Sequence, residues 1–260
     1  MPFDIGSLTD VGRRRSGNED ALDVLSLAEG EGALCVVADG MGGHQAGEVA
    51  SRLAVDTIRR TFEGGDQSFE ALLGAIRSAN RAVLAEASAD AAKQGMGTTV
   101  VCALLRGGRG RLANVGDSPA FLVRGEEVRP LTQDHSWVAE EIARGALGQD
   151  EAAAHPYRHV LTRCLGMDEQ VEVQAYEPIE LQAGDALVLC SDGLSEHVRP
   201  EELPPLVLGR SAEAAAEALV DLANERGGSD NITVIVARYE QSMASDQQPT
   251  LRLPNALRIC

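Results

Sequence analysis

Four short acidic segments carry the residues most able to do chemistry. They are Asn18-Glu19-Asp20, Ala38-Asp39-Gly40, Ser191-Asp192-Gly193 and Ser229-Asp230-Asn231. Each borders a predicted strand, and the ends of strands in one sheet can converge in space. Two carboxylates about 4 Å apart repel each other by about 4 kcal/mol at an effective dielectric constant of ~20, unless protons or cations neutralise them. If these segments converge, we therefore expect them to hold metal ions.

The donor types indicate which metal ions. Oxygen ligands without His or Cys favour the hard ions Mg²⁺ and Mn²⁺ over zinc or copper, and the carbonyl of Gly40 could complete a coordination shell that keeps several waters. Water held between two such ions becomes a nucleophile at neutral pH. A structural interpretation remains open, because Asp-Gly and Asp-Asn pairs are also common in turns and caps.

Hydrophobic periodicity predicts the elements that position these segments. We expect strands at 34–38, 98–105, 111–115, 120–123, 127–131, 185–190 and 232–237, and helices at 47–62, 68–90, 136–145 and 211–226. The first strand ends in the glycine-rich turn Asp39-Gly40-Met41-Gly42-Gly43-His44. We interpret the four strands between 98 and 131 as an antiparallel meander. The last strand is apolar on both faces, which predicts a central position in its sheet.

Composition and charge narrow the class of protein. The 260 residues are 44% hydrophobic and 24% charged, which is ordinary for a globular protein with a sizeable core. The formal net charge of -17 disfavours nucleic acid and anionic membranes as partners. Because no apolar run approaches the ~18 residues of a membrane span and no basic leader precedes one, we expect a cytoplasmic protein.

The cysteines predict buried thiols rather than metal or disulfide sites. Cys35, Cys102, Cys164, Cys190 and Cys260 form no Cys-x-x-Cys pair, and the first four lie in apolar surroundings. We therefore expect a reducing compartment.

Eight motifs follow one another along the chain. They are Gly12-Arg13-Arg14-Arg15-Ser16-Gly17-Asn18-Glu19-Asp20, Val37-Ala38-Asp39-Gly40-Met41-Gly42-Gly43-His44, Gly97-Thr98-Thr99, Asn114-Val115-Gly116-Asp117-Ser118, Leu131-Thr132-Gln133-Asp134-His135-Ser136, Leu161-Thr162-Arg163, Ser191-Asp192-Gly193 and Ser229-Asp230-Asn231. Over about residues 4–239 this order resembles the bacterial metal-dependent protein phosphatases of the PPM family, or protein phosphatase type 2C.

The resemblance implies a fold and a domain plan. The fold is α+β, a four-layer α/β/β/α sandwich in which helices flank two mainly antiparallel sheets. The phosphatase domain covers residues 1–240 and includes a flap at about 137–160, which we expect to select substrates with Trp137 as its anchor. The polar composition of residues 241–260 predicts a flexible tail.

The resemblance also implies a centre of two Mg²⁺ or Mn²⁺ ions. The bridging carboxylate falls on Asp39, the carbonyl ligand on Gly40, and the remaining ligands on Asp192 and Asp230. Three residues support these ligands from behind: Glu19 and Asp20, which hold metal-bound waters, and Asn231, which orients the ligands.

A third, weaker metal site falls on Asp117 and Asp192 in the resemblance. The family usually has Arg after the Gly-Asp-Ser motif, whereas Pro119 here supplies neither the charge nor a backbone N–H. This departure affects the third metal more than the binuclear pair.

Two basic residues complete the implied mechanism. Arg15 holds the phosphate, for which a planar guanidinium with two parallel donors is suited, and His44 is the general acid that protonates the leaving oxygen. A metal-bridging water attacks phosphorus in line. The implied function is hydrolysis of phosphoserine and phosphothreonine in proteins, which reverses Ser/Thr kinase signalling. We expect phosphorylated proteins and a cognate kinase as partners of a monomer.

Two other functions remain alternatives. One is a non-catalytic, phosphoprotein-binding scaffold of the same fold, and the other is a binuclear-metal phosphodiesterase. Cysteine-dependent phosphatase chemistry is excluded, because it needs Arg six positions after the nucleophilic Cys. Met41, Gly108, Gln170 and Glu196 stand there instead.

Overall fold

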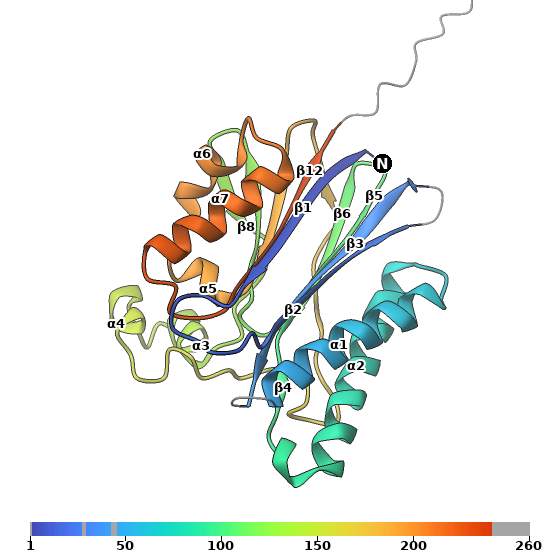
Figure 1. The fold of residues 1–260 in the computed structure, drawn as a ribbon, viewed down its shortest axis with the longest axis vertical. Coiled ribbons are helices and arrows are strands. Elements are labelled where there is room, and N and C mark those ends of the chain that lie inside the picture. Colours follow the sequence, from blue (N-terminus) through green and yellow to red (C-terminus); the bar gives the residue numbers. More distant parts are fainter. Residues whose placement is uncertain (1, 28–29, 43–45, 241–260) are drawn as a thin grey trace, which may run out of the picture.

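Two stacked antiparallel sheets form the centre of the molecule (Figure 1). The computed structural model describes residues 2–27, 30–42 and 46–240. The first sheet has the strand order β1 (Phe3–Asp10), β12 (Ile232–Tyr239), β11 (Ala186–Cys190), β7 (Ala120–Arg124), β8 (Glu127–Pro130). The second has the order β10 (Ile179–Glu180), β6 (Arg109–Val115), β5 (Val100–Arg106), β3 (Gly32–Met41), β2 (Asp20–Ser26), with β4 (Gly97–Thr98) beside β3 and β9 (Gln174–Ala175) beside β6.

Helices cover the outer faces of both sheets. Figure 1 shows α1 (Ala46–Glu63) and α2 (Phe69–Ala89) on the second sheet, and α7 (Ala212–Glu225) on the first, next to α6 (Leu203–Val207) and α5 (Asp192–Ser195). Two short helices, α3 (Trp137–Ala143) and α4 (Gln149–Ala153), lie near one end of the sheets, and single 3₁₀ turns occupy Ala91–Lys93 and Pro200–Glu202. This is the predicted four-layer α/β/β/α sandwich.

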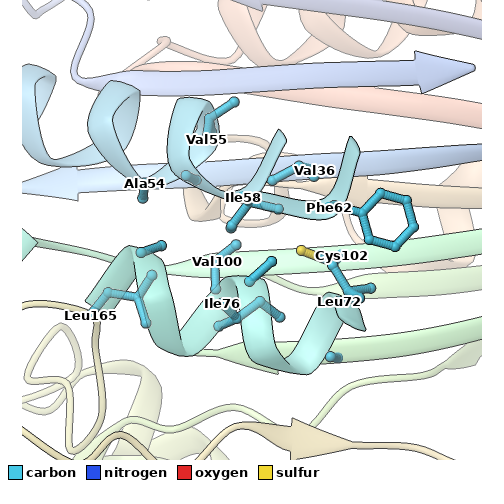
Figure 2. Packing of buried hydrophobic residues seen from close by; sticks show 14 of the residues in the cluster. Val36, Ala54, Val55, Ile58, Phe62, Leu72, Ile76, Val100, Cys102 and Leu165 are labelled. Atoms are coloured by element: carbon cyan, nitrogen blue, oxygen red, sulfur yellow. The ribbon is translucent and has the colours of Figure 1, made fainter. Parts of the chain in front are cut away.

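Strand alternation divides the apolar residues among the layers. Successive side chains of a strand point to opposite faces. On β3, Cys35 and Val37 therefore join the core between the sheets, whereas Leu34 and Val36 join the core beneath α1 and α2. Figure 2 shows part of this second core, where aliphatic side chains of α1, α2 and the second sheet pack together and Phe62 lies at one end of the cluster. A third core lies between α7 and the first sheet.

Several predicted elements are confirmed with their ends. Ser68, Ser136 and Ser211 each accept a hydrogen bond from the backbone N–H three residues later, which caps α2, α3 and α7. Strand β12 is central, between β1 and β11, as its apolar faces predicted. Cys35, Cys102, Cys164 and Cys190 are buried free thiols, while Cys260 and the predicted tail 241–260 lie outside the described residues.

The predicted meander is wrong. Strands β5 and β6 pair with each other in the second sheet, but β7 and β8 pair in the first, so the chain changes sheet at Gly116–Pro119. Gly116 makes this crossing possible, because its φ is 107° and a Cβ there would lie 2.7 Å from the side chain of Thr99. Local periodicity predicts strands but not the sheet that each one joins.

The helices also bear on the membrane question. Among the described residues, none of the helices combines the length and apolar character that a membrane-spanning helix needs.

Candidate active site

An acidic cavity of about 510 Å³ opens at one end of the two sheets. In antiparallel sheets the C-terminal end of one strand lies beside the N-terminal end of the next. The C-terminal ends of β3, β6 and β11 thus meet the N-terminal ends of β2, β5 and β12 here. The carboxylates that line the cavity are Glu19, Asp39, Asp117, Asp192, Glu196 and Asp230, and the basic residues are Arg15, Arg158 and His159. The sequence segments predicted to converge do so.

Strand register places Asp20 against Asp39. The two residues are direct partners across β2 and β3. Asp20 is buried and accepts a hydrogen bond from the Ser191 hydroxyl at 2.8 Å, and that hydroxyl in turn accepts one from the Thr233 N–H at 3.0 Å. Asp20 therefore sits behind the cavity, between the ends of β11 and β12.

The buried carboxylates have raised pKa values. Burial raises the pKa of Asp39 well above its ordinary range, and the charges of Asp20, Asp192 and Asp117 raise it further. Burial also raises the pKa of Asp192 to about 6, with help from the charges of Glu196 and Asp230. The pKa of Asp117 rises to about 8, again through burial and then through the charge of Asp192. A set of crowded oxygen donors with this electrostatic cost fits hard divalent cations, which remove the cost.

The backbone around Asp39 is held by two threonines. The Asp39 N–H donates to the Thr99 hydroxyl at 3.0 Å, and the Asp39 carbonyl accepts from the Thr98 hydroxyl and the Thr99 N–H, both at 2.8 Å. Next to it, a Cβ on Gly40 would overlap the carbonyl oxygens of Gly47 and Glu19. The Asp39-Gly40 backbone is therefore confined to one path.

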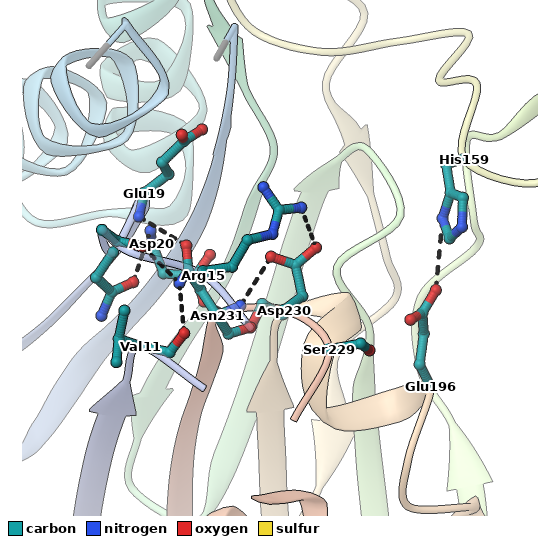
Figure 3. Close-up of polar contacts among 12 residues, drawn as sticks. Val11, Arg15, Glu19, Asp20, His159, Glu196, Ser229, Asp230 and Asn231 are labelled. Atoms are coloured by element: carbon teal, nitrogen blue, oxygen red, sulfur yellow. Dashed lines mark hydrogen bonds and ion pairs between the residues drawn. The ribbon is translucent and has the colours of Figure 1, made fainter. Parts of the chain in front are cut away.

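Arg15 and Asn231 organise the mouth of the cavity (Figure 3). Arg15 Nη2 lies 2.7 Å from Asp230 Oδ2. The Asn231 amide donates to the carbonyls of Val11 and Gly17, and its oxygen accepts from the Glu19 N–H at 2.8 Å. Asn231 therefore fastens the loop that carries Arg15 to the start of β12.

The structure adds residues that were not predicted for the site. His159 Nδ1 lies 3.4 Å from Glu196 Oε1, and ligand atoms of His159, Glu196 and Asp192 all lie within 4.8 Å of one another. The sequence showed no ligand pattern at His159. Glu196 could have been found, because Asp192 begins a short helix and Glu196 follows it by four residues, about one helical turn. His159 could not, since only the tertiary fold brings it near.

One predicted site residue cannot be placed. His44 lies outside the described residues, so its role as general acid stays a prediction. The other residues predicted for the site lie at the cavity or directly behind it, as Asp20 does.

The segment 137–160 returns to its starting point beside the cavity. The Trp137 N–H donates to the Val160 carbonyl at 2.8 Å, and Ser136 forms a bridge with Leu161. Trp137 stacks on His155 with ring centroids 4.8 Å apart and meets the ring of Tyr157 edge-on. Arg158 and His159 of the same segment line the cavity.

Several known proteins are similar to this chain in sequence and in fold. Residues 12–233 match the family described as Protein phosphatase 2C. The serine/threonine phosphatase stp of Listeria welshimeri is 37% identical over 235 residues, which cover 88% of this chain and 92% of the relative. The serine/threonine protein phosphatase PstP of Mycobacterium tuberculosis is 35% identical over 245 residues, which cover 94% of this chain and 46% of that longer protein.

Solved structures agree with the sequence comparison. The serine/threonine phosphatase of S. agalactiae superposes with a TM-score of 0.86 at 34% identity, covering 92% of this chain and all (100%) of that one. The catalytic domain of PstP, in complex with two manganese ions, has a TM-score of 0.78 at 33% identity and covers 91% of this chain and 97% of that one. This chain therefore belongs to the protein phosphatase 2C family, as an enzyme of the bacterial serine/threonine phosphatase type.

Proposed function

We propose that this protein hydrolyses phosphoserine and phosphothreonine in proteins with two divalent cations, Mg²⁺ or Mn²⁺, bound in the acidic cavity. The observation that carries the proposal is the meeting of Asp39, Asp192 and Asp230, which are far apart in sequence, at one cavity whose mouth holds Arg15. The manganese complex of the PstP catalytic domain supports the choice of metal.

Asp39, the Gly40 carbonyl, Asp192 and Asp230 would hold the two ions. When bound, the ions would supply a water activated for attack and would neutralise charge on the phosphoryl oxygens. Glu19 and Asp20 would accept hydrogen bonds from waters at the rear of the site. Their positions support this role, because Glu19 lines the cavity and the buried Asp20 is the cross-strand partner of Asp39.

Arg15 binds the phosphate in this proposal. Its guanidinium is half exposed and lies at the cavity mouth, where it pairs with Asp230. A phosphate dianion offers the same two-oxygen geometry as a carboxylate, so the guanidinium can exchange one for the other. His44 would protonate the leaving serine or threonine oxygen, as the family resemblance implies.

A third cation would bind at Asp117 and Asp192. Both carboxylates line the cavity, and the charge of Asp192 raises the pKa of Asp117, so a cation between them is favourable. Pro119 does not interrupt the local structure, because its carbonyl accepts the Cys190 N–H at 3.1 Å and joins β7 to β11. Glu196 and His159 lie close enough to Asp192 to share such an ion.

The segment 137–160 would act as the flap that selects substrates. It places Arg158 and His159 in the cavity wall and exposes Tyr157 beside them. Phosphorylated proteins, including a cognate Ser/Thr kinase and its targets, would be the partners of a monomeric enzyme.

The test compares substrates and metals. A phosphothreonine peptide and a phosphodiester are offered with Mn²⁺, with Mg²⁺ and with EDTA. The proposal expects hydrolysis of the peptide only, and only with metal. Equal turnover of the diester, or full activity in EDTA, would refute it.

A further inference from the structure

We propose that His135 is a positioning residue that couples the segment 137–160 to the carboxylate of Asp117. The inference rests on the proposed function, because it takes Asp117 as part of the reacting cavity.

His135 holds the loop that carries Asp117. Its Nδ1 accepts the Gly116 N–H at 3.1 Å, and its own N–H donates to the Gly116 carbonyl at 3.2 Å. The N–H and the carbonyl of Gly116, the residue before Asp117, are thus both hydrogen-bonded to His135. Because Nδ1 accepts a hydrogen bond, the ring carries its proton on Nε2.

The far side of the same loop is fastened to Asp39. The Ser118 hydroxyl lies 2.7 Å from the Thr99 hydroxyl, and that hydroxyl accepts the Asp39 N–H at 3.0 Å. Ser118 and Thr99 are buried. The loop that carries Asp117 is therefore hydrogen-bonded to His135 on one side and, through Ser118 and Thr99, to the Asp39 backbone on the other.

His135 also closes the base of the segment 137–160. Its carbonyl accepts both the N–H of Thr162 at 2.8 Å and the Thr162 hydroxyl at 2.9 Å. The next residues on each strand, Ser136 and Leu161, form the bridge at which the segment begins and ends. A single residue therefore makes hydrogen bonds to the Asp117 loop with its ring and to the returning chain with its carbonyl.

The side chain of His135 is buried where it joins the Asp117 loop to the segment 137–160. His135 is 3% exposed, and its Nε2 has no hydrogen-bond partner among the residues that the structure describes. A buried imidazole N–H without a hydrogen-bond partner costs free energy, which the packing of the surrounding fold must offset. A displacement of the segment 137–160, for example by a bound substrate protein, would be transmitted through His135 to Asp117.

The test uses the geometry of the ring. In His135→Asn the amide oxygen occupies the place of Nδ1 and can still accept the Gly116 N–H, whereas His135→Leu leaves that buried N–H without an acceptor. We expect His135→Leu to raise the Mn²⁺ concentration for half-maximal activity by about tenfold and to shift the emission of Trp137, the single tryptophan of the chain. His135→Asn should restore both to within about twofold.

A double variant tests the route through Asp117. If His135 acts by positioning that carboxylate, His135→Leu changes the Mn²⁺ requirement by less than about twofold once Asp117→Asn is present. The matched control is Arg124→Met. It removes an ion pair with Asp185 at the end of β7 and β11 that lies away from the cavity. It should lower the melting temperature without changing the Mn²⁺ requirement or the emission.

Clear outcomes would overturn the inference. It fails if His135→Leu and Asp117→Asn effects multiply independently, if Arg124→Met changes the Mn²⁺ requirement equally, or if His135→Asn gives no rescue. If His135→Leu does not fold, His135→Gln replaces it, since its acceptor sits one bond farther out. A wild-type protein without metal-dependent hydrolysis would overturn the proposed function instead, and the Trp137 emission would then still report whether His135 holds the segment.

Discussion

The guanidinium of Arg15 and the carboxylate of Asp230 pair at 2.7 Å across the mouth of the acidic cavity. The two residues lie 215 positions apart in the sequence. The pair joins the proposed phosphate-binding group to a proposed metal ligand, so phosphate and cation should each compete with it. A cation that binds Asp230 should therefore release Arg15 for substrate.

Replacing Arg15 should therefore separate catalysis from metal binding. Arg15→Ala is expected to lower kcat/KM for a phosphothreonine peptide by about a hundredfold, because a charged donor to the phosphoryl oxygens is lost. It should also tighten Mn²⁺ binding by up to about fivefold, since an exposed ion pair worth up to ~1 kcal/mol no longer competes for Asp230. Titration calorimetry with Mn²⁺ and steady-state kinetics measure the two effects.

The neighbouring Arg14 is the matched control. It is also exposed and forms no ion pair with the residues that the structure describes. Arg14→Ala should change neither quantity by more than about twofold, as expected of a surface substitution. Weaker Mn²⁺ binding in Arg15→Ala would contradict the competition between arginine and metal.

Asp39→Asn should have opposite effects on activity and stability. The substitution removes one carboxylate from a crowded buried set. Burial and the charges of the neighbouring aspartates raise the pKa of Asp39. Metal-dependent hydrolysis should be lost, while the melting temperature in EDTA should rise or stay the same, because desolvation of that charge no longer opposes folding.

Two comparisons sharpen this prediction. Asp221→Asn, on the exposed side of α7, should leave activity unchanged. Asp117→Ala should reduce activity less than Asp39→Asn does, if the third cation is auxiliary. A metal-free Asp39→Asn protein that melts well below the wild type would show that the carboxylate stabilises the fold by itself.

The metal-free protein should lose stability as pH rises. Burial raises the pKa of Asp20 to about 7 and the pKa of Asp117 to about 8, above the ~3.9 of an unfolded aspartate. At pH values between the unfolded pKa and these raised pKa values, the folded state binds more protons than the unfolded state. Its extra stability is therefore complete below about pH 4 and is lost as pH rises through about 7 to 8.

Urea unfolding in EDTA at pH 5.5 and pH 8, values chosen to fall within roughly that window, measures this slope. With Mn²⁺ present, stability should instead increase with pH, because metal binding needs the deprotonated carboxylates and so strengthens as pH rises. A metal-free protein that becomes more stable toward pH 8 would contradict the raised pKa values.

Gly40 should tolerate no side chain. A Cβ there would overlap two carbonyl oxygens of fixed backbone, so Gly40→Ala is expected to destabilise the fold by about 1–3 kcal/mol and to displace the adjacent Asp39. Denaturant unfolding and the Mn²⁺ requirement for activity test both effects. Gly17→Ala is the control, because nothing lies within 4 Å of its Cβ position. Equal stability of the two variants would refute the confinement of Gly40.

The sequence alone was sufficient for most individual elements and for the meeting of the acidic segments. Apolar residues at helical spacing predicted α1, α2 and α7, and the structure shows a serine cap at the start of α2, α3 and α7. The acidic segments at strand ends were expected to converge, and the structure brings Glu19, Asp39, Asp192 and Asp230 to one cavity. These features succeed because periodicity, capping and turn chemistry act over a few residues, so the local sequence contains the whole signal.

Only the tertiary structure decided which strands share a sheet and which distant side chains meet. The sequence did not distinguish a four-strand meander from hairpin β5–β6 in one sheet and hairpin β7–β8 in the other. It also gave no sign that His159 approaches Glu196, or that His135 joins the Asp117 loop to the segment 137–160. Such pairings depend on packing between residues far apart in the chain, and that packing selects one arrangement among several with the same local pattern.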